Sequence, residues 1–189
     1  MNLLIDTVSS LANIILFNSQ RKIIDNISWN IKWNESSTLI PQIDKLLKKN
    51  DIKYKDLENM VVINWPGSFT WIRTTILAIN SINYIIKKNI TWLSFFDLYK
   101  SYPIIKSSSK RDCFIKFDKT SDIKIIANNE LINILKKQNI NNIYWEVDKK
   151  IFQNIEILEK IDYKSIIKEL QFDDLKQIKA LYIKKPNIS

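Results

Sequence analysis

The segment Pro66-Gly67-Ser68-Phe69-Thr70 contains the only glycine in a chain of 189 residues. Glycine is used where φ must be positive or where another segment passes close to the backbone. A β-branched run at 60–64 precedes this glycine, and apolar residues at helical spacing follow it over 71–88. The pattern predicts a buried strand, a tight turn and a helix, with Ser68 or Thr70 as the N-cap.

A turn that leads into a helix offers free amides and a favourable dipole to an anion. This segment lacks the G-x-x-x-x-G-K-[ST] spacing of a phosphate-binding loop, and it has a single glycine. A structural turn is therefore the favoured interpretation, and a phosphate site is the alternative.

The composition fits one globular domain or two small ones, with 46% hydrophobic residues and a net charge of +9. Such a charge attracts nucleic acid or anionic lipid. Abundant Lys, Asn and Ile with scarce Gly and Ala are also typical of codon bias in an AT-rich genome, and we favour that explanation. No signal peptide and no apolar run of membrane-spanning length is evident, so we expect a cytoplasmic protein.

Several kinds of catalytic site are excluded by residue type. The chain has no histidine, and Cys113 is its single cysteine. Histidine-dependent triads, His- or Cys-based metal sites and an intrachain disulfide are therefore not expected. Catalysis by carboxylates alone stays open, with Asp6 and Asp112 as a weak candidate pair. We expect no cofactor, no metal and no catalytic residue.

Apolar runs at 3–5, 14–17 and 22–30 predict a strand meander, and residues 38–49 predict an amphipathic helix. The strand–turn–helix unit at 60–88 follows, then a strand at 91–93. The second half predicts strands at 104–106, 113–117, 122–127 and 143–147 and a helix at 129–138, followed by three amphipathic segments over 151–160, 163–170 and 172–180. This order indicates a mixed α/β architecture.

The stretch Trp65-Pro66-Gly67-Ser68-Phe69-Thr70-Trp71-Ile72-Arg73 resembles the G-P-G-S-F-T-G-[LVI]-R signature of the TsaB family at seven of nine positions. TsaB is the non-catalytic partner subunit of the bacterial complex that forms threonylcarbamoyladenosine in tRNA. The resemblance covers residues 1–100 well and the rest loosely. It implies a structural role for the turn residues Pro66, Gly67, Ser68, Phe69, Thr70 and Arg73.

The resemblance also implies the actin-like, Hsp70-like ATPase (ribonuclease H-like) fold, an α/β fold with two mixed-sheet subdomains. We place these at 1–102 and 103–189, the second being reduced. In that fold the residues after the first strand surround the nucleotide phosphates. Here Asp6-Thr7-Val8-Ser9-Ser10 has no glycine, and Val8 would obstruct a phosphate. We therefore expect no nucleotide hydrolysis, and we assign Asp6 to local turn hydrogen bonds.

In the TsaB family, the helices equivalent to 38–49 and 72–88 pack against the same pair in the catalytic subunit. The resemblance thus implies a TsaD-like catalytic partner, a TsaE-like ATPase, tRNA reached through the complex, and self-association when the chain is alone. The sequence does not decide which members of each apolar stripe point inward. The candidate partner-binding residues are Ile40, Ile43, Leu47, Thr75, Ile79, Ile82 and Ile86.

Three function classes follow. The preferred one is a scaffold subunit of the tRNA-modifying complex. The second is an enzyme, but the family's catalytic subunit holds its metal with two histidines, which this chain lacks. The third is a basic RNA-binding module without enzymatic activity, supported by the charge of +9 and six tryptophans.

Overall fold

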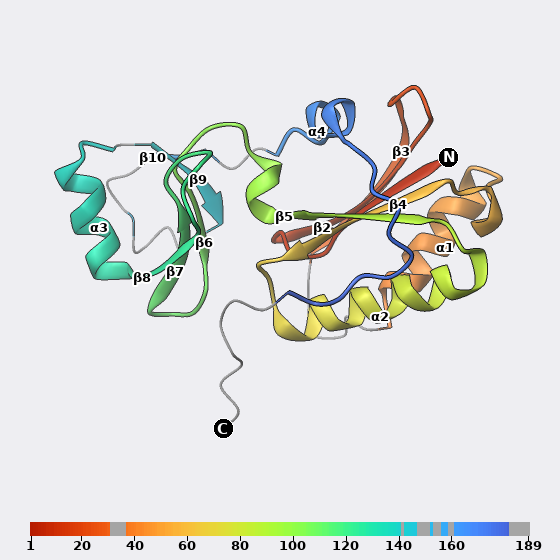
Figure 1. Cartoon of the computed structure of the whole chain (residues 1–189), viewed down its shortest axis with the longest axis horizontal. Coiled ribbons are helices and arrows are strands. Elements are labelled where there is room, and N and C mark those ends of the chain that lie inside the picture. The colour runs from red at the N-terminus through yellow and green to blue at the C-terminus, as the bar shows by residue number, and fades with distance from the viewer. Residues whose placement is uncertain (31–36, 141, 147–151, 153–155, 159–160, 182–189) are drawn as a thin grey trace. The chain divides into compact units, whose positions relative to one another are not determined.

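The computed structural model describes all residues except 31–36, 141, 147–151, 153–155, 159–160 and 182–189. Contacts divide the chain into two units, and each is described by itself (Figure 1). The first unit combines Met1–Phe95 with Tyr163–Ser189, and the second is Phe96–Asp162.

The first unit is built on a sheet with the strand order β3-β2-β1-β4-β5. Strands β1 (Asn2–Asp6), β2 (Leu11–Phe17) and β3 (Ile23–Asn30) form the predicted antiparallel meander. Strands β4 (Asn59–Trp65) and β5 (Asn89–Ser94) join it parallel to β1. Both parallel strands need a crossover, and the helix between β4 and β5 supplies one of them.

Two helices cover one face of this sheet and a third covers the other (Figure 1). Helix α1 (Leu39–Lys49) contacts β2 and β3, and α2 (Phe69–Ile86) contacts β4 and α1. Helix α4 (Tyr163–Glu169) packs on the opposite face. There Ile167 and Leu170 join a buried cluster with Leu4, Ile15, Phe17 and Val61.

An ion pair and a hydrogen bond also join the end of helix α1 to Asp25 of strand β3. Lys49 Nζ lies 2.8 Å from Asp25 Oδ2, and Asn50 Nδ2 donates to the same oxygen at 3.0 Å. The hydrogen bond from Lys49, followed by that from Asn50, holds the pKa of Asp25 below its usual value.

Two short 3-10 helices, η1 (Tyr54–Asp56) and η2 (Phe95–Leu98), complete the connections.

The second unit is a smaller sheet with the order β10-β9-β6-β7-β8. Its strands are β6 (Ile104–Ser107), β7 (Asp112–Lys116), β8 (Lys124–Ala127), β9 (Asn142–Glu146) and β10 (Glu156–Leu158). Helix α3 (Asn128–Lys137) buries Leu131 and Leu135 against Ile105, Ile115 and Ile143.

The division of the chain differs from the predicted boundary of 1–102 and 103–189. Residues from Tyr163 onward return to the first unit because α4 carries apolar residues that complete its core. Of the three amphipathic segments predicted after residue 150, 163–170 forms α4 and 172–180 forms no helix or strand. The first, 151–160, lies largely outside the described residues; its described part contains β10.

Candidate partner-binding face and its surroundings

The Gly67 turn is shaped by close packing. Of the two reasons for a glycine that the sequence left open, a positive φ does not apply, because Gly67 has none. A Cβ atom at this position would instead lie 2.9 Å from both Cβ and Cγ1 of Val8. The glycine therefore lets the β4–α2 turn approach the turn that follows β1. Ser68 is the N-cap by position, as one of the two predicted alternatives had it, but its side chain makes no capping hydrogen bond.

The Asp6 carboxylate is buried and accepts hydrogen bonds from the turn that follows β1 and from helix α4. Oδ1 accepts hydrogen bonds from the Val8 amide at 2.9 Å and the Ser9 amide at 3.0 Å. Oδ2 accepts from the Ser9 hydroxyl at 2.5 Å and from the Tyr163 hydroxyl of α4 at 2.6 Å. The predicted local turn role of Asp6 is confirmed, with an added long-range bond.

This arrangement leaves the turn after β1 poorly suited to a phosphate. A phosphate cradle needs backbone amides that point at the anion. The amides of Val8 and Ser9 already donate to Asp6, and the Val8 side chain lies against Gly67. The second carboxylate of the candidate pair, Asp112, begins β7 of the other unit and accepts a hydrogen bond from Ser109.

Four of the predicted partner-binding residues are buried inside the first unit: Ile43, Leu47, Thr75 and Ile79. Thr75 faces the sheet, where its hydroxyl is hydrogen-bonded to that of Thr7 at 2.7 Å. The structure therefore corrects this part of the list, since a buried side chain offers no surface to a partner. Of the other three, Ile82 and Ile86 are half-buried, and Ile40 is 42% exposed.

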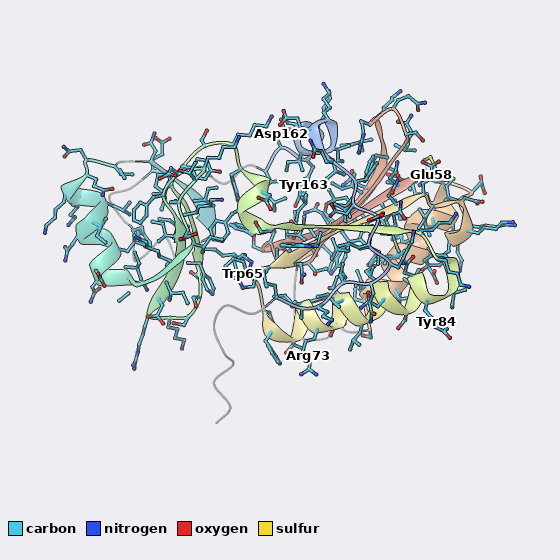
Figure 2. All side chains as sticks on the ribbon, in the orientation of Figure 1. Glu58, Trp65, Arg73, Tyr84, Asp162 and Tyr163 are labelled. Carbon is cyan, nitrogen blue, oxygen red and sulfur yellow. The ribbon has the colours of Figure 1, made fainter. Side chains whose placement is uncertain are left out.

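The exposed apolar face of α2 lies elsewhere on the helix. Leu77, Tyr84 and Ile85 are 64%, 85% and 79% exposed. Residues seven and eight apart lie on the same side of an α-helix, so these three share one face. Figure 2 shows Arg73 and Tyr84 projecting outward from α2, away from the sheet. We call Phe69, Arg73, Leu77, Tyr84 and Ile85 the outer face of α2.

The first turn of this outer face carries a cation. The Arg73 guanidinium lies 5.1 Å from the centre of the Phe69 ring, which is itself exposed. Both residues were predicted as parts of a structural turn, yet both lie at the surface. Sequence reasoning missed Leu77 and Tyr84. The available signal was that they are large apolar residues off the stripe formed by Ile72, Ile76 and Ile79.

The side of α2 next to strand β5 is covered by residues 172–181, which we call the C-terminal strap (Figure 1). Ile90 donates its amide to the Leu175 carbonyl at 2.7 Å, at the edge of the sheet. Asparagine side chains then hold the backbone of the strap. Asn83 donates to the Lys176 carbonyl, Asn80 bonds both the amide and the carbonyl of Ile178, and Asn64 donates to the Lys179 carbonyl.

A hollow lies where the strap meets the second half of α2. It has a volume of about 640 Å³ and is lined by Asn80, Asn83, Tyr84, Lys87, Lys176 and Gln177. Its two lysines make it basic, and Tyr84 joins it to the outer face of α2. The Lys176 ammonium also contacts the Asn89 side chain.

No group of three or more His, Cys, Asp or Glu side chains among the described residues is placed to hold a metal ion. Burial raises the pKa of the Cys113 thiol to about 12, so it is protonated and a poor nucleophile at neutral pH. No helix within the described ranges has the length and apolar character needed to cross a bilayer.

Sequence comparison finds a relative that aligns with nearly the whole chain. No protein-family profile matches the chain. An uncharacterized MG208 homolog of Mycoplasma pneumoniae is 22% identical over 192 aligned residues, covering 97% of this chain and 95% of that protein.

Comparison of structures is more specific. A crystal structure of "an uncharacterized protein with similarity to peptidase YEAZ from Pseudomonas aeruginosa" superposes with a TM-score of 0.74 and 10% identity, covering 97% of this chain and 99% of that one. YeaZ from Pseudomonas aeruginosa gives a TM-score of 0.53 and 13% identity over 67% of this chain and 63% of that one. The chain therefore has the two-sheet, actin-like α/β fold of YeaZ (TsaB) proteins.

Proposed function

We propose that this chain is a non-catalytic, cytoplasmic subunit of a tRNA-modifying complex, and that it binds a TsaD-like catalytic paralogue through the outer face of α2 and Ile40 of α1. The TsaB-like signature at 65–73 and the YeaZ-like fold support this role. A TsaE-like ATPase and tRNA would join through the assembled complex.

The observation that carries the proposal is the exposure of Leu77, Tyr84 and Ile85 on one side of a helix. Exposed apolar groups gathered on one face typically mark an interaction site, whereas single ones need no explanation. Aromatic residues and arginine are enriched among the residues that contribute most to binding, and Tyr84 and Arg73 are of these types.

An enzymatic role has weaker support. One structural neighbour is named for its similarity to a peptidase. This chain has no histidine, and its one thiol is buried. The turn after β1, which an ATPase would need for phosphates, is filled by Asp6 and Val8. We therefore propose that the chain contributes a binding surface rather than reacting groups.

The decisive experiment is co-purification of this 189-residue chain with the TsaD-like protein of the same genome. A charge placed in an interface loses its water without gaining a partner, so Leu77→Asp and Ile85→Asp should each weaken binding at least about tenfold. Ile24→Asp is the matched control, because Ile24 is an exposed isoleucine of strand β3 in the same unit. It should bind as the wild type does.

Melting curves and circular dichroism separate loss of binding from loss of folding. All three variants should remain close to wild type, since each altered residue is exposed. Normal binding by both α2 variants would contradict the proposed face. Binding of isolated chain to tRNA, insensitive to the α2 variants and lost at high salt, would favour the basic RNA-binding module instead.

A further inference from the structure

The hollow between the C-terminal strap and the second half of α2 has a shape that the chain itself fixes. Its volume is about 640 Å³. Asn80 and Asn83, two of its lining residues, each donate to a strap carbonyl at 2.8 Å. Asn80 also accepts the amide of Ile178. These bonds hold the strap against α2, so the hollow is present before anything enters it.

The hollow carries positive charge that the described residues do not balance. Lys87, at the end of α2, and Lys176, on the strap, are both exposed lining residues. Lys176 contacts the neutral side chain of Asn89, and neither lysine is ion-paired with a described residue. Asp173 and Asp174 of the strap are exposed and do not line the hollow. Two ammonium groups without a carboxylate between them attract an anionic group.

The neighbouring surface indicates which kind of anion fits. Tyr84 lines the hollow and also belongs to the outer face of α2, where Leu77 and Ile85 are exposed. A protein that covers these apolar side chains reaches the hollow through Tyr84. An RNA backbone would instead place its phosphates beside apolar groups that offer them no contact. Protein interfaces combine an apolar centre with a polar rim, so the surroundings favour carboxylates of a protein.

We propose that this hollow receives an acidic segment of the catalytic partner, at the rim of the interface formed by the outer face of α2. The proposal rests on the proposed function and adds the charge that the partner presents at this place. Lys87 and Lys176 attract the carboxylates, and Tyr84 packs against the segment that carries them. Charges at a rim mainly speed association and fix orientation, whereas the apolar centre slows dissociation.

The test measures the association and dissociation rates of the 189-residue chain with the TsaD-like protein at low and high salt. The double variant Lys87→Glu/Lys176→Glu should associate about tenfold more slowly at low salt, because attraction becomes repulsion. The neutral pair Lys87→Gln/Lys176→Gln should give an intermediate rate. In roughly 1 M salt the rates of wild type and variants should converge, because exposed charges are screened.

A second double variant controls for the change in net charge. Lys164 and Lys168 are exposed on α4, on the opposite face of the sheet from α2. Lys164→Glu/Lys168→Glu alters the net charge by the same amount as the variant of the hollow. Its association rate should stay within about twofold of wild type, since the steering charges lie elsewhere. Circular dichroism and melting curves should show that both double variants fold as the wild type does.

The outcomes separate this proposal from the proposed function. If the Lys87/Lys176 variant associates normally while Leu77→Asp still weakens binding, the hollow is overturned and the proposed function stands. The opposite pattern supports the hollow and contradicts the outer face. Normal partner binding with a loss of tRNA affinity assigns the hollow to RNA and overturns the proposal. Absence of binding by the wild-type chain overturns both.

Discussion

Val8 and Gly67 show how a single pair of residues fixes two turns of the first unit. Val8 follows the buried Asp6, and its side chain fills the space that a Cβ on residue 67 would occupy. The sequence alone indicated that Gly67 had a backbone role, but it left two physical reasons open. The short distances to the Val8 side chain show that close packing, and not a positive φ, requires the glycine. Residues 8 and 67 are far apart in the chain, and apolar periodicity carries no information about such a contact.

Gly67→Ala is therefore expected to lower the free energy of unfolding by about 1–3 kcal/mol, because the new methyl group overlaps Val8. Val8→Gly removes both atoms that lie 2.9 Å away. Chemical denaturation of the two single variants and the double variant forms a thermodynamic cycle. The double variant should be more stable than the sum of the single effects allows. Additive effects would show that the glycine is required for another reason.

At the scale of elements, the first meander, the helix at 38–49, the strand–turn–helix unit and β6 to α3 were predicted within a few residues of their observed bounds. Strong apolar periodicity made this possible. The partner-binding list fared differently. Helix α2 buries polar Thr75 and Asn83 and exposes Leu77 and Ile85, because hydrogen bonds to Thr7 and to the C-terminal strap satisfy the buried polar groups. Apolar periodicity alone therefore named buried residues of the sheet-facing side of α2 as partner-binding candidates.

The C-terminal strap depends on the asparagines of α2. Asn83 is buried, donates to the carbonyls of Lys176 and Lys88, and accepts the Lys88 amide. Asn83→Ala should lower stability by about 1–3 kcal/mol, since buried backbone groups lose partners. It should also speed amide hydrogen exchange within 172–181. Ser81→Ala, at an exposed position of the same helix, is the control. Unchanged exchange in the strap of the Asn83 variant would show that these bonds do not hold it.

At the scale of the whole molecule, the sequence predicted two sheets and the α/β class, and the structure confirms both. The predicted boundary placed residues 103–189 in one subdomain, because no linker or composition change marks the return at Tyr163. The return is specified by contacts: Tyr163 bonds Asp6, and Ile167 and Leu170 pack on Leu4 and its neighbours.

Ile167→Ala tests this division of the chain. The residue is fully buried, so the change should cost about 2–5 kcal/mol. Hydrogen exchange should accelerate in β1, β2 and β4 while β6 and β7 of the second unit keep their protection. Ile24→Ala alters an exposed isoleucine, and it should change neither the stability nor the hydrogen exchange of these strands. Loss of protection in β6 and β7 instead would assign α4 to the second unit.

The return of the chain at Tyr163 also orders events during synthesis on the ribosome. The second unit is continuous in sequence and lies entirely before residue 163, so its parts have all been made before α4 emerges. The larger sheet is translated first, yet Asp6 and the apolar face under α4 wait for Tyr163, Ile167 and Leu170. When the sequence of the second unit has been synthesised in full, the first unit still lacks these residues, so its core can be completed only after the second unit has been translated.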